Sequence, residues 1–287
     1  MRLPKFDPRN VRVRDGGSGG GIGRGGSVGC GTLIIVVIAA LVFGVDPGQM
    51  LGGMDSAQQQ APTQQAPGGR SAEEICGQNQ YAMEACNALS SLNETWQPIF
   101  ARAGIAFEQP TLHFYQGGTR SGCGAAQSAM GPFYCPADNG IYIDTSFYDQ
   151  MARRMGAGGD FARYYVIAHE YGHHVQNLSG VAAQVRSAQA QNRRNANQLQ
   201  VRMELMADCY AGVWAAKNRQ YIEPGDMEEG LRAASAIGDD TLMRNAGQRV
   251  NPESFTHGSS EQRMTWLDKG MRTGNDDACD TFSDLRR

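Results

Sequence analysis

The sequence predicts an α+β fold that is mostly helical, with a small β-sheet, preceded by one transmembrane helix. Segments with apolar residues at helical spacing fill much of the chain after residue 71. Short aromatic and β-branched segments lie among them between residues 111 and 144. Ahead of both, residues 25–45 contain no charged side chain, as a membrane-crossing helix requires.

The overall charge argues against a nucleic-acid partner. The 287 residues carry a formal net charge of −3, and a protein that neutralises nucleic-acid phosphates needs an excess of lysine and arginine. The hydrophobic content of 41% is that of an ordinary globular protein. Nothing in the sequence indicates an oligomeric state.

The uncharged run has the length of a single membrane span. Its 21 residues would extend about 32 Å as a helix, and we predict the span itself at residues 28–46. By the positive-inside rule, the tail at residues 1–27 stays in the cytoplasm and the rest lies outside it, anchored in the inner membrane. A cleaved signal peptide and a buried core helix are the alternatives, and the long charged region before the run argues against cleavage. The basic residues of that region are Arg2, Lys5, Arg9, Arg12, Arg14 and Arg24.

A linker and a cysteine-containing domain follow. Residues 47–70 are rich in Gln, Pro, Gly and Ala and predict a flexible linker to a domain at residues 71–287. The domain holds six cysteines, an even number that suits disulfides outside the cytoplasm. Six cysteines allow 15 pairings, and sequence cannot choose among them. Short spacings favour Cys76 with Cys86 and Cys123 with Cys135, which leaves Cys209 for Cys279.

The first part of the domain should contain helices and then strands. Ser71 and the acidic residues after it open a segment that we expect to form two helices. The segments TLHFY, GPFYCP and GIYID are expected to form strands, and Asn139-Gly140 between the last two is a hairpin signal. We expect residues 141–144 to offer a sheet edge to an extended peptide.

Longer helices should make up the second part. Asp160 is expected to cap a helix that Gly180 ends. Residues 196–218 predict a second long helix because good helix formers fill them. Ser259 and Gln262 stand at capping-box spacing at the start of a last helix.

The segment VIAHEYGHHVQ, residues 166–176, carries the strongest chemical signal. His169 and His173 are four residues apart, so on a helix both rings project from one face and can share a zinc ion. Glu170 then lies beside the ion as a general base for a water that the metal activates. His174 points about 100° away from His173 and is expected to pack or to form hydrogen bonds.

A zinc site of this type needs a third protein ligand. The metzincin extension is excluded, since Gln176 and Ser179 stand where that class has glycine and histidine. The segment ELMAD on the second long helix supplies Glu204 as the ligand. Asp208, four residues later, can accept a hydrogen bond from a ligating imidazole and orient it.

With these motifs the chain resembles the gluzincin metallopeptidases, which carry H-E-x-x-H on one helix and E-x-x-[AS]-D on the next. It is more closely similar to the bacterial putative neutral zinc metallopeptidase family, single-pass membrane proteins that share GPFYCP, YID, AHEYGHHVQ and HGSSEQR. The resemblance covers most of the chain from Ser71 onward. It implies a zincin-like metallopeptidase domain.

Membrane gluzincins also carry a His-Pro-x-x-x-x-Arg segment, and THGSSEQR is similar to it. The similarity implies that His257 and Arg263 return to the cleft, where they steady the oxyanion or hold the substrate. Gly258 replaces the proline of that pattern. The nearest alternatives are a loop histidine exposed to solvent and an arginine in a structural ion pair.

Two functions remain open from the sequence. The first is a membrane-anchored, zinc-dependent endopeptidase outside the cytoplasm that acts on peptides or proteins, with ligands His169, His173 and Glu204 and general base Glu170. The second is a non-catalytic, zinc-stabilised binding or scaffold module of the periplasm or cell envelope. An intact Glu170 favours the first, because a structural zinc site requires no general base.

Overall fold

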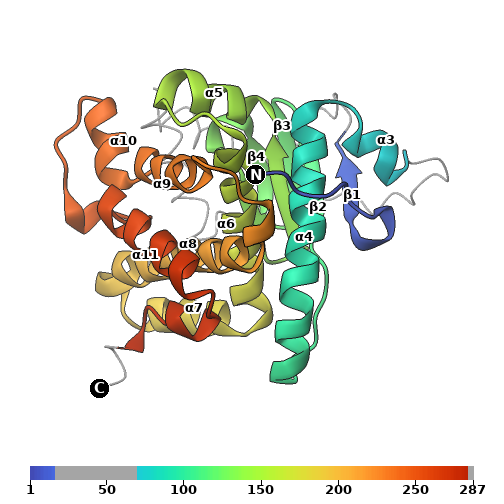
Figure 1. Ribbon diagram of the computed structural model, residues 1–287. Helices are drawn as coiled ribbons and strands as arrows, with labels where there is room; N and C mark the ends of the chain where they lie inside the picture. The colour runs from blue at the N-terminus through green and yellow to red at the C-terminus, as the bar shows by residue number, and fades with distance from the viewer. Residues whose placement is uncertain (17–69, 284–287) are drawn as a thin grey trace, which may run out of the picture.

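The computed structural model describes residues 1–16 and 70–283. The predicted membrane span at residues 28–46, and all of the predicted linker except Arg70, lie outside these ranges. Within the described ranges, no helix combines the length and the apolar character needed to cross a membrane. Helices form most of the folded unit, and the strands gather beside the long helix α4 (Figure 1). The predicted α+β class, mostly helical with small sheets, is confirmed.

Four strands form the main sheet, in the order β1-β2-β6-β5. The first three run parallel, and β5 pairs antiparallel with β6 across a turn in which Asn139 has a φ of 53°. Strands β3 and β4 form a separate antiparallel hairpin. The bounds are β1 Arg12–Asp15, β2 Thr111–Tyr115, β3 Gly118–Ser121, β4 Gly124–Gln127, β5 Phe133–Cys135 and β6 Gly140–Asp144.

The expected sheet edge at residues 141–144 is wrong. These residues belong to β6, which is buried along its whole length and pairs on both sides. The hairpin turn at Asn139 places β5 on one side of β6, and the connection through β3 and β4 leaves β2 to pair with the other. The free edge on this side of the sheet is therefore β5.

Two helices, α3 and α4, follow Ser71 as expected. Ser71 caps α3 in a capping box with Glu74, and Asn79 caps α4 by accepting from the backbone N–H of Ala82 at 2.9 Å. Ser259 and Gln262 form the predicted capping box of α11. The helices are α3 Ala72–Cys76, α4 Gln80–Ala103, α5 Ser146–Met155, α6 Asp160–Leu178, α7 Val181–Gln191, α8 Ala196–Lys217, α9 Asp226–Ala236, α10 Asp239–Asn245 and α11 Ser260–Thr273.

Helix α8 lies between α6 and α11 and packs closely on both. Residues without a side chain permit the contact with α11. A Cβ atom on Gly212 would collide with the backbone of α11, and one on Gly270 would collide with the backbone of α8. The same close packing places α11, drawn in red, against α8 and α9 (Figure 1).

The expected cap of α6 is corrected by the structure. Asp160 is the first residue of the helix and the N-cap position is Gly159, which has no side chain to cap it. The carboxylate of Glu229 on α9 accepts from the backbone N–H of Phe161 at 3.2 Å. The Asp160 carboxylate instead accepts from the ammonium of Met1, with both oxygens 3.1 Å away. At the other end Gly180 adopts a left-handed φ of 80° just after the cap residue Ser179, as expected of a helix-ending glycine.

Residues 1–16 fold onto the same unit. Phe6 and Val11 are buried, the side-chain amide of Asn93 donates to the carbonyl of Asn10 at 2.7 Å, and β1 pairs with β2. The structure therefore differs from the predicted division, in which residues 1–27 form a separate tail. The reason is that β1 supplies backbone hydrogen-bonding partners along a side of β2 that would otherwise be an open sheet edge.

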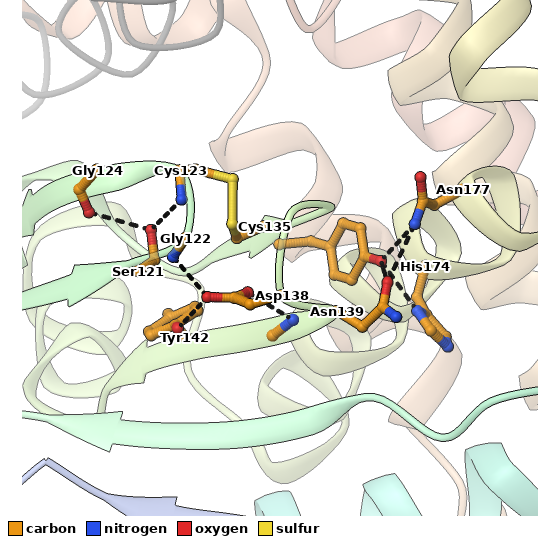
Figure 2. The surroundings of a disulfide bond; sticks show 12 residues. Ser121, Gly122, Cys123, Gly124, Cys135, Asp138, Asn139, Tyr142, His174 and Asn177 are labelled. Atoms are coloured by element: carbon orange, nitrogen blue, oxygen red, sulfur yellow. Dashed lines mark hydrogen bonds between the residues drawn. A yellow bond between two sulfur atoms is a disulfide. The ribbon is translucent and has the colours of Figure 1, made fainter. Parts of the chain in front are cut away.

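The three disulfides are the favoured pairs, Cys76–Cys86, Cys123–Cys135 and Cys209–Cys279. The last joins α8 to the turn after α11. The second joins the β3–β4 turn to β5, and Figure 2 shows it close to Asp138. The Asp138 carboxylate accepts from the Gly122 backbone at 2.6 Å and from the Tyr142 hydroxyl at 2.7 Å.

Candidate metal centre

Three predicted ligands meet between α6 and α8. The Nε2 atoms of His169 and His173 lie 3.1 Å and 3.4 Å from the same Glu204 oxygen, Oε2. The two rings are one helical turn apart, with centroids separated by 4.9 Å. One ligand atom from each residue lies within 4.8 Å of the others. His169 and Glu204 are buried, and His173 is partly exposed.

This donor set fits zinc. Two imidazole nitrogens and one carboxylate oxygen are a ligand set of catalytic zinc sites, with zinc–ligand bonds near 2.0–2.2 Å. Around a tetrahedral ion with such bonds, two ligand atoms lie about 3.3 Å apart. The distances from Glu204 Oε2 to the two imidazole nitrogens, 3.1 and 3.4 Å, match that separation.

A glycine inside the motif allows the two ligand-bearing helices to approach. A Cβ atom on Gly172 would lie 2.9 Å from the Cα atom of Ala207 and 3.0 Å from its carbonyl oxygen. A side chain at this position would therefore clash with the backbone of α8. The short distance between α6 and α8 is what lets Glu204 reach both histidines.

Asp208 orients His169. Its Oδ1 lies 2.8 Å from Nδ1 of His169 and accepts that ring proton, which leaves Nε2 directed at Glu204. The Tyr165 hydroxyl donates to the same oxygen at 2.6 Å. Asp208 is fully buried, and it makes the contact with His169 that the predicted orienting role requires.

Arg263 lies behind this pair rather than at the mouth of the site. The side chain is buried, and its Nε and Nη2 donate to the two oxygens of Asp208 at 2.8 and 2.9 Å. Nη1 donates to the carbonyl of Ile237 at 3.2 Å. The predicted contact with an oxyanion is therefore corrected: the guanidinium balances the charge of buried Asp208, and its Nη2 also lies 3.3 Å from Nδ1 of His169.

The other two ligands also have partners beyond the centre. Nδ1 of His173 lies 2.9 Å from Oε1 of Gln176. The side-chain amide of Gln200 donates to Oε1 of Glu204 at 2.8 Å, so that Oε2 is the oxygen turned to the histidines.

Glu170 is the carboxylate without a partner. It is only 8% exposed, yet no residue in the described ranges forms a hydrogen bond or ion pair with it. A carboxylate without a protein partner stays charged at little cost only where its oxygens reach solvent, and the Glu170 oxygens are not among the fully buried atoms that lack a hydrogen bond. An unpaired one beside three convergent ligands suits a base that waits for a proton from a bound water.

His257 lies beside the centre but is not one of the ligands. Its Nδ1 lies 3.4 Å from Oδ1 of Asp239 and 3.0 Å from the Thr256 hydroxyl. The other Asp239 oxygen accepts from the backbone N–H groups of Thr256, His257 and Gly258 at 2.6, 2.7 and 3.1 Å. Asp239 thus fixes the loop that carries His257.

The charges of the centre hold its pKa values away from their ordinary range. Burial lowers the pKa of His169, but the charge and hydrogen bonds of Asp208 and Glu204 outweigh it and raise the pKa to about 9. The pKa of His173 is raised despite burial, chiefly by Glu204. Burial raises the pKa of Glu204, yet the charges of His173 and His257 hold it well below its usual range. The Arg263 guanidinium likewise outweighs burial and keeps the pKa of Asp208 at about 2.

His174 turns away from the metal ligands, as its place on the helix predicts. Its Nε2 donates to the carbonyl of Glu108 at 2.7 Å, and its Nδ1 lies 3.0 Å from the Tyr134 hydroxyl. Asn177, one turn later, donates to Asn139 of the β5–β6 turn at 3.1 Å (Figure 2). These contacts hold the hairpin against the helix of the motif. Burial lowers the pKa of His174 to about 4, which keeps the ring neutral at pH 7.

The model of the putative neutral zinc metallopeptidase family matches residues 6–282. The chain belongs to this family.

Curated relatives match over most of their length. The uncharacterized protein YpfJ of Escherichia coli K12 is 47% identical over 264 residues, which cover 91% of this chain and 87% of the relative. The uncharacterized proteins Mb2605 of Mycobacterium bovis and Rv2575 of Mycobacterium tuberculosis H37Rv are each 39% identical over 262 residues, or 85% of both chains. No solved structure matches the chain.

Several residues of the centre were not predicted from the sequence. Asp239 and Tyr165 lie far from the residues they contact, and no spacing rule links them. Gln176 and Gln200 could have been found, because they stand three and four residues from His173 and Glu204, within one helical turn.

The raised pKa values predict how zinc binding depends on pH. Because the pKa of His169 is raised to about 9, both ring nitrogens are protonated in the metal-free protein below that pH. Zinc must displace one of these two protons, because imidazole binds metal only when neutral. We therefore expect zinc affinity to rise from about pH 6 to pH 9, roughly tenfold per pH unit for each proton released. Titration calorimetry in buffers of different ionisation enthalpy measures both affinity and proton release. A flat affinity over this range would contradict the assignment.

Proposed function

We propose that this member of the family is a zinc-dependent endopeptidase. His169, His173 and Glu204 would hold the ion, with Asp208 as the partner that orients His169. A zinc ion in such a site lowers the pKa of a bound water and polarises the peptide carbonyl. Family membership supports zinc metallopeptidase chemistry at the level of the family description.

The remaining chemistry falls to Glu170 and His257. Glu170 accepts a proton from the attacking water as the new C–O bond forms, and it returns that proton to the amine as the C–N bond breaks. His257 lies close enough to Glu204 to lower its pKa, and the Asp239 loop holds its ring. A proton on its Nε2 would stabilise negative charge on the carbonyl oxygen.

The observation that carries this proposal is the carboxylate of Glu170, which has no protein partner among the described residues, on the same helix turn as two of three convergent ligands. A zinc-stabilised binding module would not need such a base. Structural zinc sites are also closed by a fourth protein ligand, whereas the ligand group in the described residues has three members. Both features favour catalysis over a scaffold role.

We also propose that the catalytic unit works outside the cytoplasm. All six cysteines of residues 70–283 form disulfides, and disulfides persist in oxidising compartments such as the periplasm. Attachment to the inner membrane rests on the apolar run within residues 28–46 and stays a prediction from the sequence.

Replacing Glu170 by Gln should abolish hydrolysis and leave zinc in place. The amide keeps the shape of the side chain but cannot accept the proton, so we expect the rate on a diverse peptide library to fall by at least about 10²-fold. Zinc content, measured by atomic emission on the same full-length protein, should stay at one ion per chain.

The matched control is Glu253→Gln, which makes the same chemical change on an exposed turn. It should leave both readings unchanged. Persistent hydrolysis by a zinc-loaded Glu170→Gln protein would refute the assigned base. Native protein that holds zinc but cuts no peptide would instead favour the binding module.

Replacing His257 by Ala should lower kcat and spare the metal. Loss of one donor to a developing oxyanion costs about 10²–10³-fold in kcat, and the ring is not a ligand, so zinc affinity should change little. Steady-state kinetics with chelator competition separate the two effects. Ser254→Ala, on the exposed turn just before this loop, is the control. An unchanged kcat would remove His257 from the reaction.

A further inference from the structure

Gln176 is an uncharged, buried side chain that contacts the predicted ligand His173 and is not itself a predicted ligand. Its exposed fraction is 0%. It lies one turn after His173 on α6 and forms two side-chain hydrogen bonds. Oε1 faces Nδ1 of His173 at 2.9 Å, and Nε2 faces the carbonyl oxygen of Met203 at 2.6 Å.

These two contacts determine the tautomer of His173. A backbone carbonyl only accepts, so the amide group of Gln176 must turn its NH₂ toward Met203. Its oxygen must then face His173, and that oxygen also only accepts. Nδ1 of His173 must therefore carry a ring proton, so that in the neutral ring the lone pair lies on Nε2, the nitrogen that faces Glu204.

The same amide connects the two ligand-bearing helices. Met203 precedes Glu204 on α8, and the bond from Gln176 holds its carbonyl against α6. The side chain of Gln176 thus orients the ring of His173 and holds the backbone next to Glu204. Because the group is buried, water cannot replace either bond without rearrangement.

A neutral amide suits this place better than a carboxylate. At His169 the orienting group is Asp208, whose charge is balanced by Arg263 through two hydrogen bonds. The described residues provide no cation in contact with Gln176. A carboxylate there would add an unbalanced charge beside Glu204.

We infer that Gln176 is a positioning residue for the metal centre: it fixes His173 in the tautomer that ligates through Nε2 and holds α8 so that Glu204 meets it. This inference rests on the proposed zinc site. It also concerns the metal-free protein, since the hydrogen bonds exist without the ion.

The test compares Gln176→Met with Gln176→Glu. Methionine removes both hydrogen bonds at similar volume, and we expect zinc affinity, measured by chelator competition, to fall about 10–100-fold. Glutamate still accepts from Nδ1 but loses the bond to Met203 and adds an unbalanced charge, so its zinc affinity should fall as well, and the tautomer of His173 is what separates the two variants. Gln191→Met, an exposed position on α7, is the control.

Nitrogen NMR on histidine-labelled, zinc-free protein at alkaline pH supplies a readout that needs neither zinc nor activity. Native protein and Gln176→Glu should show His173 protonated at Nδ1, and Gln176→Met should lose that signature. If Gln176 only stabilised the fold, both variants would lose stability to a similar degree, and His173 would stay protonated at Nδ1 in each. Such a result overturns the inference even if the native protein is an active peptidase.

The proposed function can fail separately. If native protein binds zinc and hydrolyses nothing, the peptidase proposal fails, while the tautomer and affinity differences still decide the role of Gln176. If zinc does not bind, the NMR comparison alone decides it.

A second, independent observation concerns the N-terminal segment. The register pairs Arg12 with Thr111 and Val13 with Leu112 in a parallel ladder, and Phe6 N–H donates to the side chain of Asn87 at 3.0 Å. Arg2 forms an ion pair with Glu223 at 2.8 Å. These contacts tie residues 1–16 to β2, α4 and the turn before α9.

We propose that residues 1–16 and residues 70–283 occupy the same compartment in the folded protein. A backbone ladder and buried side chains require direct contact, which a membrane between the two parts would prevent. The adjoining ends of the two described ranges also lie together, because Asp15 contacts both Arg70 and Gln78.

This proposal opposes the single-crossing topology expected from the basic N-terminal residues. One crossing by residues 28–46 would separate the two described parts, so crossing and docking exclude each other. Some of those basic residues have another explanation in the fold: Arg2 pairs with Glu223, and Arg12 lies 3.5 Å from Glu108. Their charge serves docking and is not by itself evidence of a cytoplasmic tail.

The test is labelling with a membrane-impermeant maleimide on spheroplasts of a Gram-negative host, using the full chain with Cys30→Ser. Arg9→Cys reports on the N-terminal segment and Arg272→Cys on α11; both native side chains are highly exposed, at 89% and 76%. Equal labelling of intact spheroplasts supports the proposal.

Labelling of the α11 position in intact spheroplasts, with the N-terminal position labelled only after lysis, overturns it. Labelling of both only after lysis supports a shared compartment and refutes the proposed extracytoplasmic location. Cys30→Ser protein without either new cysteine measures background.

Discussion

The close approach of α6 and α8 is the constraint on which the candidate site depends. Gly172 faces the backbone of Ala207 with no room for a side chain between them. At this separation the two helices present His169 and His173 from one side and Glu204 from the other, within hydrogen-bonding distance. Gly212 and Gly270 permit an equally close contact of α8 with α11, which brings Arg263 behind Asp208. Small residues at helix contacts, rather than the ligands themselves, set the spacing of the centre.

Charge balance is the second constraint. Glu204 and Asp208 are buried acids, and each is compensated by neighbours that the helix packing supplies. Asp208 has Arg263 and the ring proton of His169. Glu204 has the two histidines, which hold protons more firmly than usual while no metal is bound. A zinc ion would replace those protons as the compensating charge, so metal binding and proton release are two descriptions of one exchange. Glu170 stands outside this balance, as the proposed role of a general base requires.

The strands and the N-terminal segment hold the centre in place from a distance. The β5–β6 hairpin is bound to α6 through the contacts of Tyr134 with His174 and of Asn139 with Asn177 (Figure 2). The Cys123–Cys135 disulfide ties that hairpin to the β3–β4 turn. On the far side of the sheet, β1 closes the edge of β2. The N-terminal segment is thus part of the folded unit of a family member whose model matches from residue 6 onward.

The local sequence determined the helical and strand elements, most of their caps, the disulfide pairs favoured by spacing, and the two ligand-bearing motifs, because each depends on residues within a turn or two of one another. The H-E-x-x-H and E-x-x-x-D spacings place side chains on one helix face whatever the surrounding fold. Tertiary structure alone decided the rest. It placed Arg263 behind Asp208, put Asp239 under His257, buried β6 between two strands, and folded residues 1–16 onto the sheet. These arrangements join residues that are distant in the chain, and their free energy comes from packing and charge compensation that no short window of sequence contains.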